Sequence, residues 1–171
     1  GKIGSRHVIT MRNGCAGFFT PEEVRASGGI VLTHEEKQPA RGVINGWRPL
    51  VPVFRATYDD GRIDALRNGD PAACFGDLFA GIQLSSSLKL PGGRMKLIHR
   101  IQLLDPAGGR YGLGRIMAEA DIHPDDWFLA CHFVDDMVMP GTLMYQCCEH
   151  ALRVLLIRMG WVSERTEVCF E

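Results

Sequence analysis

One segment brings together the residue types that acid–base chemistry beside a carbonyl group needs. In CHFVDDMVMPGTLMYQ, residues 131–146, His132 stands shortly before a predicted helix that Pro140-Gly141 opens. A neutral histidine is the usual general base near pH 7. The unpaired N–H groups of a helix's first turn, here at Gly141 and Thr142, can hold a carbonyl oxygen that gains negative charge. Together they suit removal of a proton next to a carbonyl, although spacing alone favours His132 as a packed loop residue.

Two other kinds of site fit this segment less well. Adjacent Cys131 and His132 cannot easily serve one tetrahedral ion, and no second spaced pair lies nearby, so we expect no metal. A nucleophilic Cys131–His132 pair is disfavoured because neighbouring side chains of an extended segment point to opposite faces. Asp135 and Asp136 are expected to cap or brace the loop.

The element that follows is predicted to be a long buried helix over residues 142–159, because the stretch lacks Pro and Gly and Gly160 follows as a cap. A helix that is apolar over so much of its circumference is wrapped by a sheet. Cys147 and Cys148 are expected to act as small buried residues. The narrower polar face is predicted to consist of Gln146, Glu149, His150 and Arg153.

Alternating side chains predict a strand over residues 94–105, a turn at 105–109 and a second strand over 115–122, together a hairpin. A short helix is expected over 62–68, before the Asn68-Gly69-Asp70-Pro71 break. The fold class is therefore α+β, with a curved antiparallel sheet around one central helix.

The first part of the chain carries weaker signals. Residues 5–19 are typical of strand material around an Asn13-Gly14 turn. Thr20 should cap a short helix that ends near Ala26, before Gly28-Gly29. Residues 38–52 are expected to be an irregular connector and a boundary.

Composition narrows the class of protein. The chain has 171 residues with a formal net charge of −1 and 46% hydrophobic residues, which indicates a globular domain and leaves nucleic-acid binding unsupported. Its longest apolar run, at 154–157, is too short for a membrane span. Six cysteines without a C-x-x-C pair, and no signal segment, favour reduced thiols and a cytoplasmic setting. The missing initiator Met suggests a piece of a longer protein.

Residues 73–160 resemble the hot-dog-fold 3-hydroxyacyl-thioester dehydratases. The matching text is CFGDLFAG from residue 74, PGGRMKLIHRI from residue 91 and ADIHPDDWFLACHFVDDMVMPGTLM from residue 120. The resemblance is closest to the bacterial 3-hydroxydecanoyl-ACP dehydratase and to dehydratase domains of polyunsaturated fatty acid synthases and polyketide synthases. It implies a hot-dog domain whose leading part is residues 61–171.

A shorter match, HVITMRNGCAGFFTPEEV from residue 7, resembles the end of a preceding hot-dog unit. It implies that residues 1–27 are the terminal strand and tail of that unit and that residues 28–60 form a linker. Closure of the sheet around the helix is then expected to need further strands from residues 1–58 or from another polypeptide segment.

The resemblance also implies roles for individual residues. His132 would remove the α-proton of a 3-hydroxyacyl thioester while a backbone carbonyl at Val138 holds its ring. The N–H of Gly141 would polarise the thioester carbonyl, with Thr142 and Phe133 as further substrate-binding residues.

The same resemblance implies the partners. The substrate would arrive on the phosphopantetheine arm of an acyl carrier protein, with no metal or redox cofactor, and the product would be the 2-enoyl thioester, with double-bond isomerisation open. An acyl tunnel would lie at a homodimer or pseudo-dimer interface. Arg94, Lys96 and Arg100 could face the acidic carrier, but a solvated strand face explains them more simply.

One position departs from the family pattern. The family's Asp or Glu on the central helix, donated to the other unit's histidine, protonates the leaving hydroxyl, and this sequence has Gln146 there. An amide cannot deliver a proton as a carboxylic acid does. Three alternatives stay open: an engineered Glu→Gln trap, a natural weak or non-dehydrating unit that binds acyl-ACP or completes a neighbouring site, and a different acid such as Glu149.

Overall fold

The computed structural model describes residues 2–8, 10, 12, 17–29, 31–38, 47–109 and 111–161. Contacts divide the chain into two units, Gly1–Arg41 and Gly42–Glu171. Each unit is described by itself.

The first unit contains two very short strands and one short helix. Strand β1 (Lys2–Ile3) pairs antiparallel with β2 (Arg6–His7). Helix α1 (Pro21–Ala26) begins with a capping box, in which Thr20 and Glu23 bond each other's backbone N–H, and this confirms the predicted cap. Of the strand expected over 5–19, the described residues show only β2, and the Asn13-Gly14 turn lies outside them. Every side chain described in this unit is exposed.

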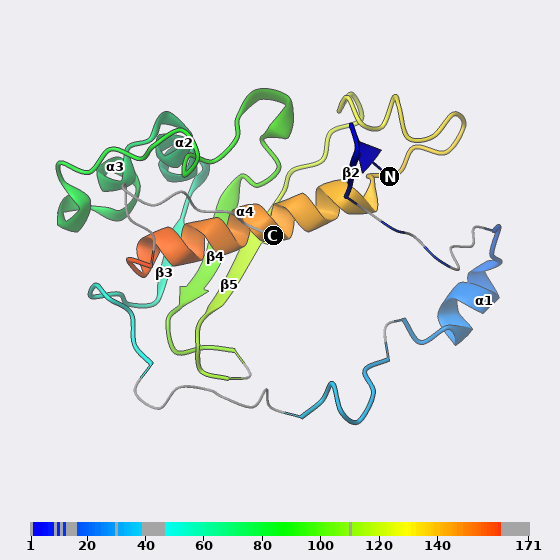
Figure 1. Cartoon of the computed structure of the whole chain (residues 1–171), viewed down its shortest axis with the longest axis horizontal. Helices are drawn as coiled ribbons and strands as arrows, with labels where there is room; N and C mark the ends of the chain where they lie inside the picture. Colours follow the sequence, from blue (N-terminus) through cyan, green and yellow to red (C-terminus); the bar gives the residue numbers. More distant parts are fainter. Residues whose placement is uncertain are drawn as a thin grey trace. The chain divides into compact units, whose positions relative to one another are not determined.

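The second unit contains an antiparallel sheet in the order β3-β4-β5 (Figure 1). Its strands are β3 (Ala56–Tyr58), β4 (Arg100–Asp105) and β5 (Arg115–Glu119). The predicted hairpin is confirmed, with Ile101 opposite Ala118 and Leu104 opposite Ile116. Because β3 lies within residues 28–60, the predicted linker stretch contributes to this sheet.

The predicted strand over 94–105 is too long at its start. Residues Gly93–Met95 form a 3-10 turn, η2, and strand pairing begins only at Arg100. The register of the hairpin also shifts between Ile101 and Leu103. A shift of one residue exchanges the two faces of a strand, so Leu104 is fully buried while Leu103 is only half-buried.

Two helices precede the sheet's long strands. Helix α2 (Asp60–Asn68), capped by Asp59 and ended by Gly69 at a φ of 83°, confirms the helix expected over 62–68. Helix α3 (Pro71–Phe75) was not predicted, because Pro71 was interpreted only as a break. Asp70 accepts from the N–H of Ala73 at 2.9 Å, so Asp-Pro here opens a helix. A 3-10 turn, η1 (Asp77–Phe79), follows.

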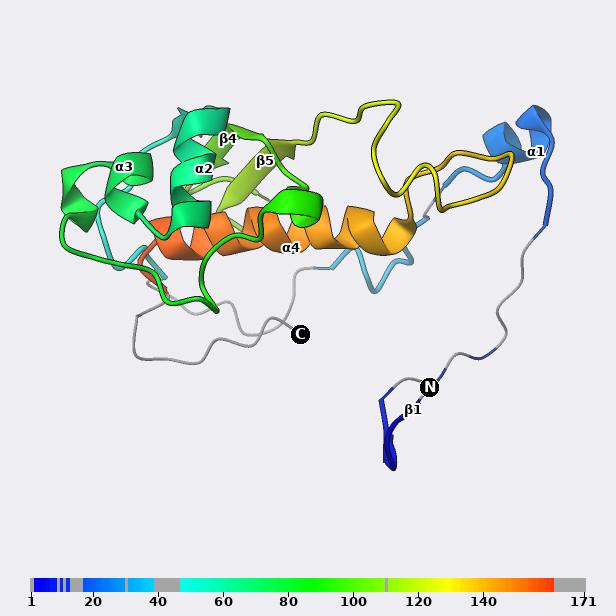
Figure 2. The same cartoon turned by 90° about the horizontal axis from the view of Figure 1, so that it is seen from above.

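Helix α4 (Gly141–Arg158) lies along the sheet and beneath α2 and α3 (Figures 1 and 2). It confirms the predicted helix, and Gly160 at a φ of 78° follows it. The antiparallel sheet with its long helix confirms the α+β class. The main core gathers α2, β4 and α4 side chains, among them Ile63, Leu66, Ile101, Leu104, Val154 and Met159.

The polar residues predicted for one face of α4 are not its exposed side. His150 is 1% exposed, and Glu149 and Arg153 pair with each other at 2.6 Å with little exposure. Arg153 also donates to the carbonyl of Lys89 at 2.8 Å, so its charge is satisfied beside the preceding loop. The exposed side is instead largely apolar and includes Met144, Tyr145, Cys148 and Leu152.

The cysteines differ in their surroundings. Cys74 is buried, which raises the pKa of its thiol to about 12, and Cys147 is half-buried. Cys131 and Cys148 are exposed, so the prediction of a buried Cys148 was wrong. All four are free thiols, and Cys15 and Cys169 lie outside the described residues. In the described part of the chain, no helix is long and apolar enough to cross a membrane.

Candidate functional site

The loop between β5 and α4 holds His132 in one orientation. The Nδ1 atom of His132 lies 3.1 Å from the carbonyl oxygen of Val138, and the N–H of Val138 donates to the carbonyl of His132 at 2.8 Å. A carbonyl oxygen only accepts, so Nδ1 carries the hydrogen and the neutral ring presents the lone pair of Nε2. His132 is half-buried. This arrangement suits a general base.

The turn that follows His132 is held by its backbone. Phe133 and Asp136 exchange N–H···O bonds of 2.5 and 3.2 Å, and Asp135 has a φ of 63°. The rings of His132 and Phe133 lie with their centroids 3.6 Å apart. The backbone of Asp136 therefore braces the loop, while none of the described side chains caps α4, whose N-cap is Pro140. The capping part of the prediction for Asp135 and Asp136 was wrong.

The start of α4 is open to a ligand. Leu143 and Met144 donate to the carbonyl of Pro140, and among the described residues nothing accepts from the N–H groups of Gly141 and Thr142. A Cβ added at Gly141 would meet no atom within 4 Å. The two N–H groups lie at the positive end of an 18-residue helix, where a carbonyl oxygen gaining negative charge is stabilised.

Gln146 lies one turn beyond Thr142 on α4 and is half-buried. Within the described part of the chain, no hydrogen bond joins it to His132. The alternative acid, Glu149, accepts from Arg153 at 2.6 Å, and its side chain is 15% exposed. The Glu149 carboxylate is therefore already engaged in an ion pair on α4.

An apolar hollow of about 290 Å³ lies between α4 and the sheet, starting at the residue after Gln146. The Sγ–H of Cys147 donates to the carbonyl of Leu97 at 3.2 Å, and burial raises the pKa of this thiol. Small side chains on both walls leave the space unfilled. The lining residues are Ile98, Ile116, Ala118, Ala120, Cys147, Cys148 and Ala151.

The basic residues considered for a carrier protein are mostly paired within the chain. Lys96 lies 2.9 Å from Asp60 and 3.2 Å from Asp64. Arg100 binds the Asp121 carboxylate through two nitrogens at 2.8 and 2.5 Å, and this holds the pKa of Asp121 below its usual range. These pairs fit the simpler interpretation of a solvated strand face.

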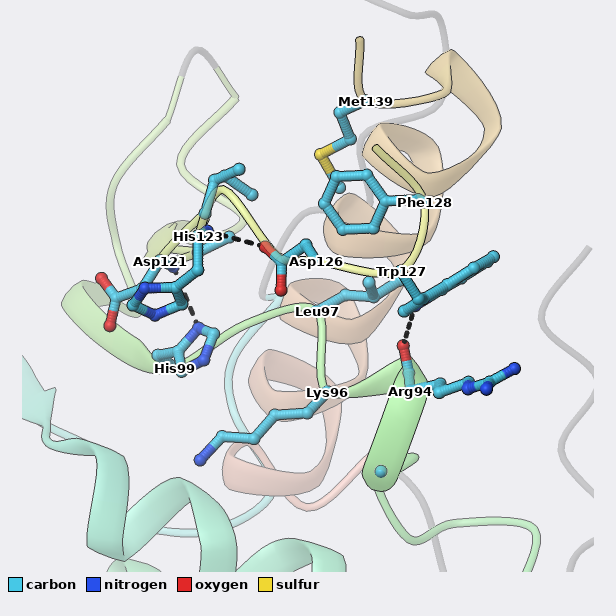
Figure 3. Close-up of a pocket in the computed structure, with 13 residues that line it drawn as sticks. Arg94, Lys96, Leu97, His99, Asp121, His123, Asp126, Trp127, Phe128 and Met139 are labelled. Carbon is cyan, nitrogen blue, oxygen red and sulfur yellow. Dashed lines mark hydrogen bonds between the residues drawn. The ribbon is translucent and has the colours of Figure 1, made fainter. Parts of the chain in front are cut away.

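A second, more polar hollow of about 200 Å³ was missed by the sequence reasoning (Figure 3). It lies between the segment before β4, the segment after β5 and Met139. His99, His123, Asp126 and Trp127 contribute its polar groups. These positions lie up to 28 residues apart in the sequence and meet only through the hairpin, so no spacing signal could have found them. Among the described residues, no group of three or more His, Cys, Asp or Glu could hold a metal ion.

Comparisons with known proteins agree with the resemblance found in the sequence. Residues 90–170 match the family model of the FabA-like domain. Over 162 residues the chain is 33% identical to a subunit of the polyunsaturated fatty acid synthase of Thraustochytrium sp. (strain ATCC 26185 / S-3). The match covers 92% of this chain but 11% of that protein, so the chain spans about a tenth of its relative's length. The predicted likeness to dehydratase domains of such synthases is confirmed.

Proposed function

We propose that this chain is the leading part of a 3-hydroxyacyl-ACP dehydratase of the hot-dog family in fatty acid biosynthesis, because residues 90–170 match the FabA-like domain model and the chain is similar to a polyunsaturated fatty acid synthase subunit. The observation that carries the proposal is the bond from the His132 Nδ1 to the Val138 carbonyl, a few residues before the open start of α4. The two features supply a base and an oxyanion site within one short segment, residues 132–142.

The proposed reaction needs only proton transfers. The Nε2 of His132 takes a proton from C2 of the thioester while the N–H groups of Gly141 and Thr142 stabilise the negative charge on its carbonyl oxygen. The Val138 carbonyl then stabilises the imidazolium through Nδ1–H. The C3–O bond breaks as a general acid supplied by the paired hot-dog unit protonates the hydroxyl, so that water leaves and the 2-enoyl thioester remains. This chemistry uses no redox cofactor.

The acyl chain would occupy the hollow beside Cys147 and Cys148, because its lining residues are aliphatic or cysteine and begin next to Gln146. Phe133 and Val138, both exposed in the loop, would contact the substrate near its reacting carbons. The pantetheine arm of an acyl carrier protein would deliver it.

The amide at Gln146 bears on which pair of hot-dog units would form a complete active site. In the proposed arrangement the central helix of each unit supplies its acid to the histidine of the other unit. A homodimer of this chain would place Gln146 beside both histidines and lack the acid in each site. A pseudo-dimer with a different hot-dog unit could give His132 a complete partner. The second candidate function, favoured by Gln146, is an impaired unit that binds acyl-ACP or completes a neighbouring site.

A dehydration assay on 3-hydroxyacyl-ACP tests the proposal, with the product and its double-bond position identified by mass spectrometry. His132→Ala should lower the rate by about 10²–10⁴-fold, and His34→Ala, an exposed histidine of the first unit, should not. An active protein whose rate survives His132→Ala would refute the mechanism. Acyl-ACP binding without turnover in both the native chain and Gln146→Glu would support the second candidate. The cytoplasmic setting stays a prediction.

A further inference from the structure

The short segment before β4 accepts hydrogen bonds from both elements that build the proposed site. Figure 3 shows the indole N–H of Trp127 donating to the carbonyl of Arg94, at 2.9 Å. The Sγ–H of Cys147 donates to the carbonyl of Leu97 at 3.2 Å. Trp127 lies in the loop between β5 and α4, and Cys147 lies on α4 itself. The segment therefore ties the loop that carries the proposed base to the helix, although it supplies no atom to the proposed proton transfers.

A small apolar core, separate from the main one, packs against Trp127 and Cys147. Its buried members are Leu97, Phe128 and Leu143. Each comes from a different part of the site: the segment before β4, the loop and the first turn of α4. The ring of Phe128 meets the ring of Trp127 nearly edge to face, with centroids 5.9 Å apart and planes at 83°. Trp127 thus holds the loop's member of this core through its ring as well as through its N–H.

A turn carries the chain from Phe128 to the proposed base. The N–H of Cys131 donates to the carbonyl of Phe128 at 3.2 Å, and His132 follows directly. Beyond His132 the loop gains little from burial, because Phe133 and Val134 are 55% and 88% exposed. The position of the His132 ring relative to α4 therefore depends on how firmly the Phe128 end of the loop is held.

We propose that Trp127 is a positioning residue for the dehydration: its bond to the Arg94 carbonyl keeps His132 in place relative to the start of α4. Trp127 touches none of the reacting atoms of the proposed mechanism and acts through Phe128 and the turn that follows it. Positioning of this kind matters because a displacement of about 1 Å can cost about 10²-fold in rate. The proposal rests on the proposed function, but the effect of the bond on the loop can be measured without activity.

Trp127→Phe tests the proposal, because phenylalanine keeps an aromatic ring beside Phe128 and removes the N–H. The kcat for dehydration of 3-hydroxyacyl-ACP by the intact protein should fall about tenfold, while KM stays within about twofold, since no substrate contact is lost. Trp161→Phe is the matched control, because Trp161 is exposed, lies beyond the other end of α4 and should not affect kcat. A native kcat in Trp127→Phe, or an equal fall in Trp161→Phe, would overturn the proposal. A raised KM with an unchanged kcat would also overturn it, because Trp127 would then be a binding residue.

Hydrogen exchange, measured by mass spectrometry, follows the loop without needing activity. The N–H of Val138 donates to the carbonyl of His132 at 2.8 Å, so its exchange rate reports how well the loop is ordered. In Trp127→Phe the peptide that contains Val138 should exchange about tenfold faster, while helix α2 keeps its native rate. Equal acceleration in α2 would show general destabilisation and overturn the proposal. Faster exchange at Val138 in a protein without dehydratase activity would refute only the proposed function. Dehydration that depends on His132, with native exchange at Val138 in Trp127→Phe, would refute only the positioning role.

Discussion

His132 and Val138 hold each other through two hydrogen bonds, from ring Nδ1 to carbonyl at 3.1 Å and from backbone N–H to carbonyl at 2.8 Å. The first bond sets which ring nitrogen is basic, and the second sets where the Val138 carbonyl stands. The orientation of the proposed base therefore depends on backbone atoms and not on a carboxylate.

Val138→Pro should lower the dehydration rate by about tenfold or more, because it removes the N–H that positions the carbonyl and so misplaces the base. Val138→Ala keeps both backbone bonds and should retain most of the rate. Steady-state kinetics on 3-hydroxyacyl-ACP would compare the two. Equal losses in both variants would mean that the Val138 side chain, and not its backbone, matters.

Gln146→Glu should raise the dehydration rate of a homodimeric preparation by about 10²–10⁴-fold, since a carboxylic acid can protonate the leaving hydroxyl and an amide cannot. Gln146→Leu, which removes the amide without supplying an acid, should give no rise. The assay is initial rate against pH. A fall in rate with Gln146→Glu would show that the amide has a role of its own.

His150→Leu should flatten the loss of stability in acid. Burial lowers the pKa of His150, so between the folded and unfolded pKa values the unfolded chain binds more protons. The free energy of unfolding therefore falls as pH drops below about 6.5, the unfolded value. Urea unfolding at pH 7.5 and 5.5 measures the difference. His123→Gln, at an exposed position, is the control and should lose as much free energy of unfolding between pH 7.5 and 5.5 as the native chain does. The same loss in His150→Leu would contradict the prediction.

Arg158→Met should destabilise the second unit by about 2–4 kcal/mol. Arg158 is 8% exposed, and its guanidinium donates to the Tyr58 hydroxyl at 3.2 Å and to the Pro52 carbonyl at 3.0 Å. The guanidinium also lies within 6 Å of two phenylalanine ring centroids. Arg115→Met, on the exposed side of β5, is the control. Thermal or urea unfolding of both variants checks the expected difference, and equal stabilities would contradict it.

Ala118→Val should shift the proposed dehydratase toward shorter acyl chains, because the added methyl groups narrow the apolar hollow beside α4. Ala107→Val, in the hairpin turn, should not change the preference. Competition between 3-hydroxyacyl-ACPs of different lengths measures the shift. An unchanged preference would place the acyl chain elsewhere.

Local signals predicted the elements whose ends are fixed by neighbouring residues. Thr20 and Gly160 mark helix ends through backbone bonds within a few positions, and both were found from the sequence. The strand start before Arg100 was predicted wrongly, because alternation of side chains cannot show where a strand begins to pair, and Gly93–Met95 forms a 3-10 turn instead. The burial of His150 could not be predicted, because it depends on how α4 packs, which helical periodicity cannot show.

The site was predictable in part. The resemblance suggested that the Val138 carbonyl holds the His132 ring, and in the structure the Val138 carbonyl oxygen lies 3.1 Å from Nδ1 of His132. Their catalytic roles stay predictions. The hollow around His99 and Asp126 could not be predicted, since pairing of β4 with β5 creates it.

The exposed apolar side of α4 has a practical consequence for handling the protein. Met144, Tyr145 and Leu152 are each about half exposed, and the free thiol of Cys148 lies among them. Apolar surface of this kind favours self-association, and two Cys148 thiols brought together could then be cross-linked by air oxidation. A purified sample should therefore become increasingly turbid with time unless it is kept dilute and reduced.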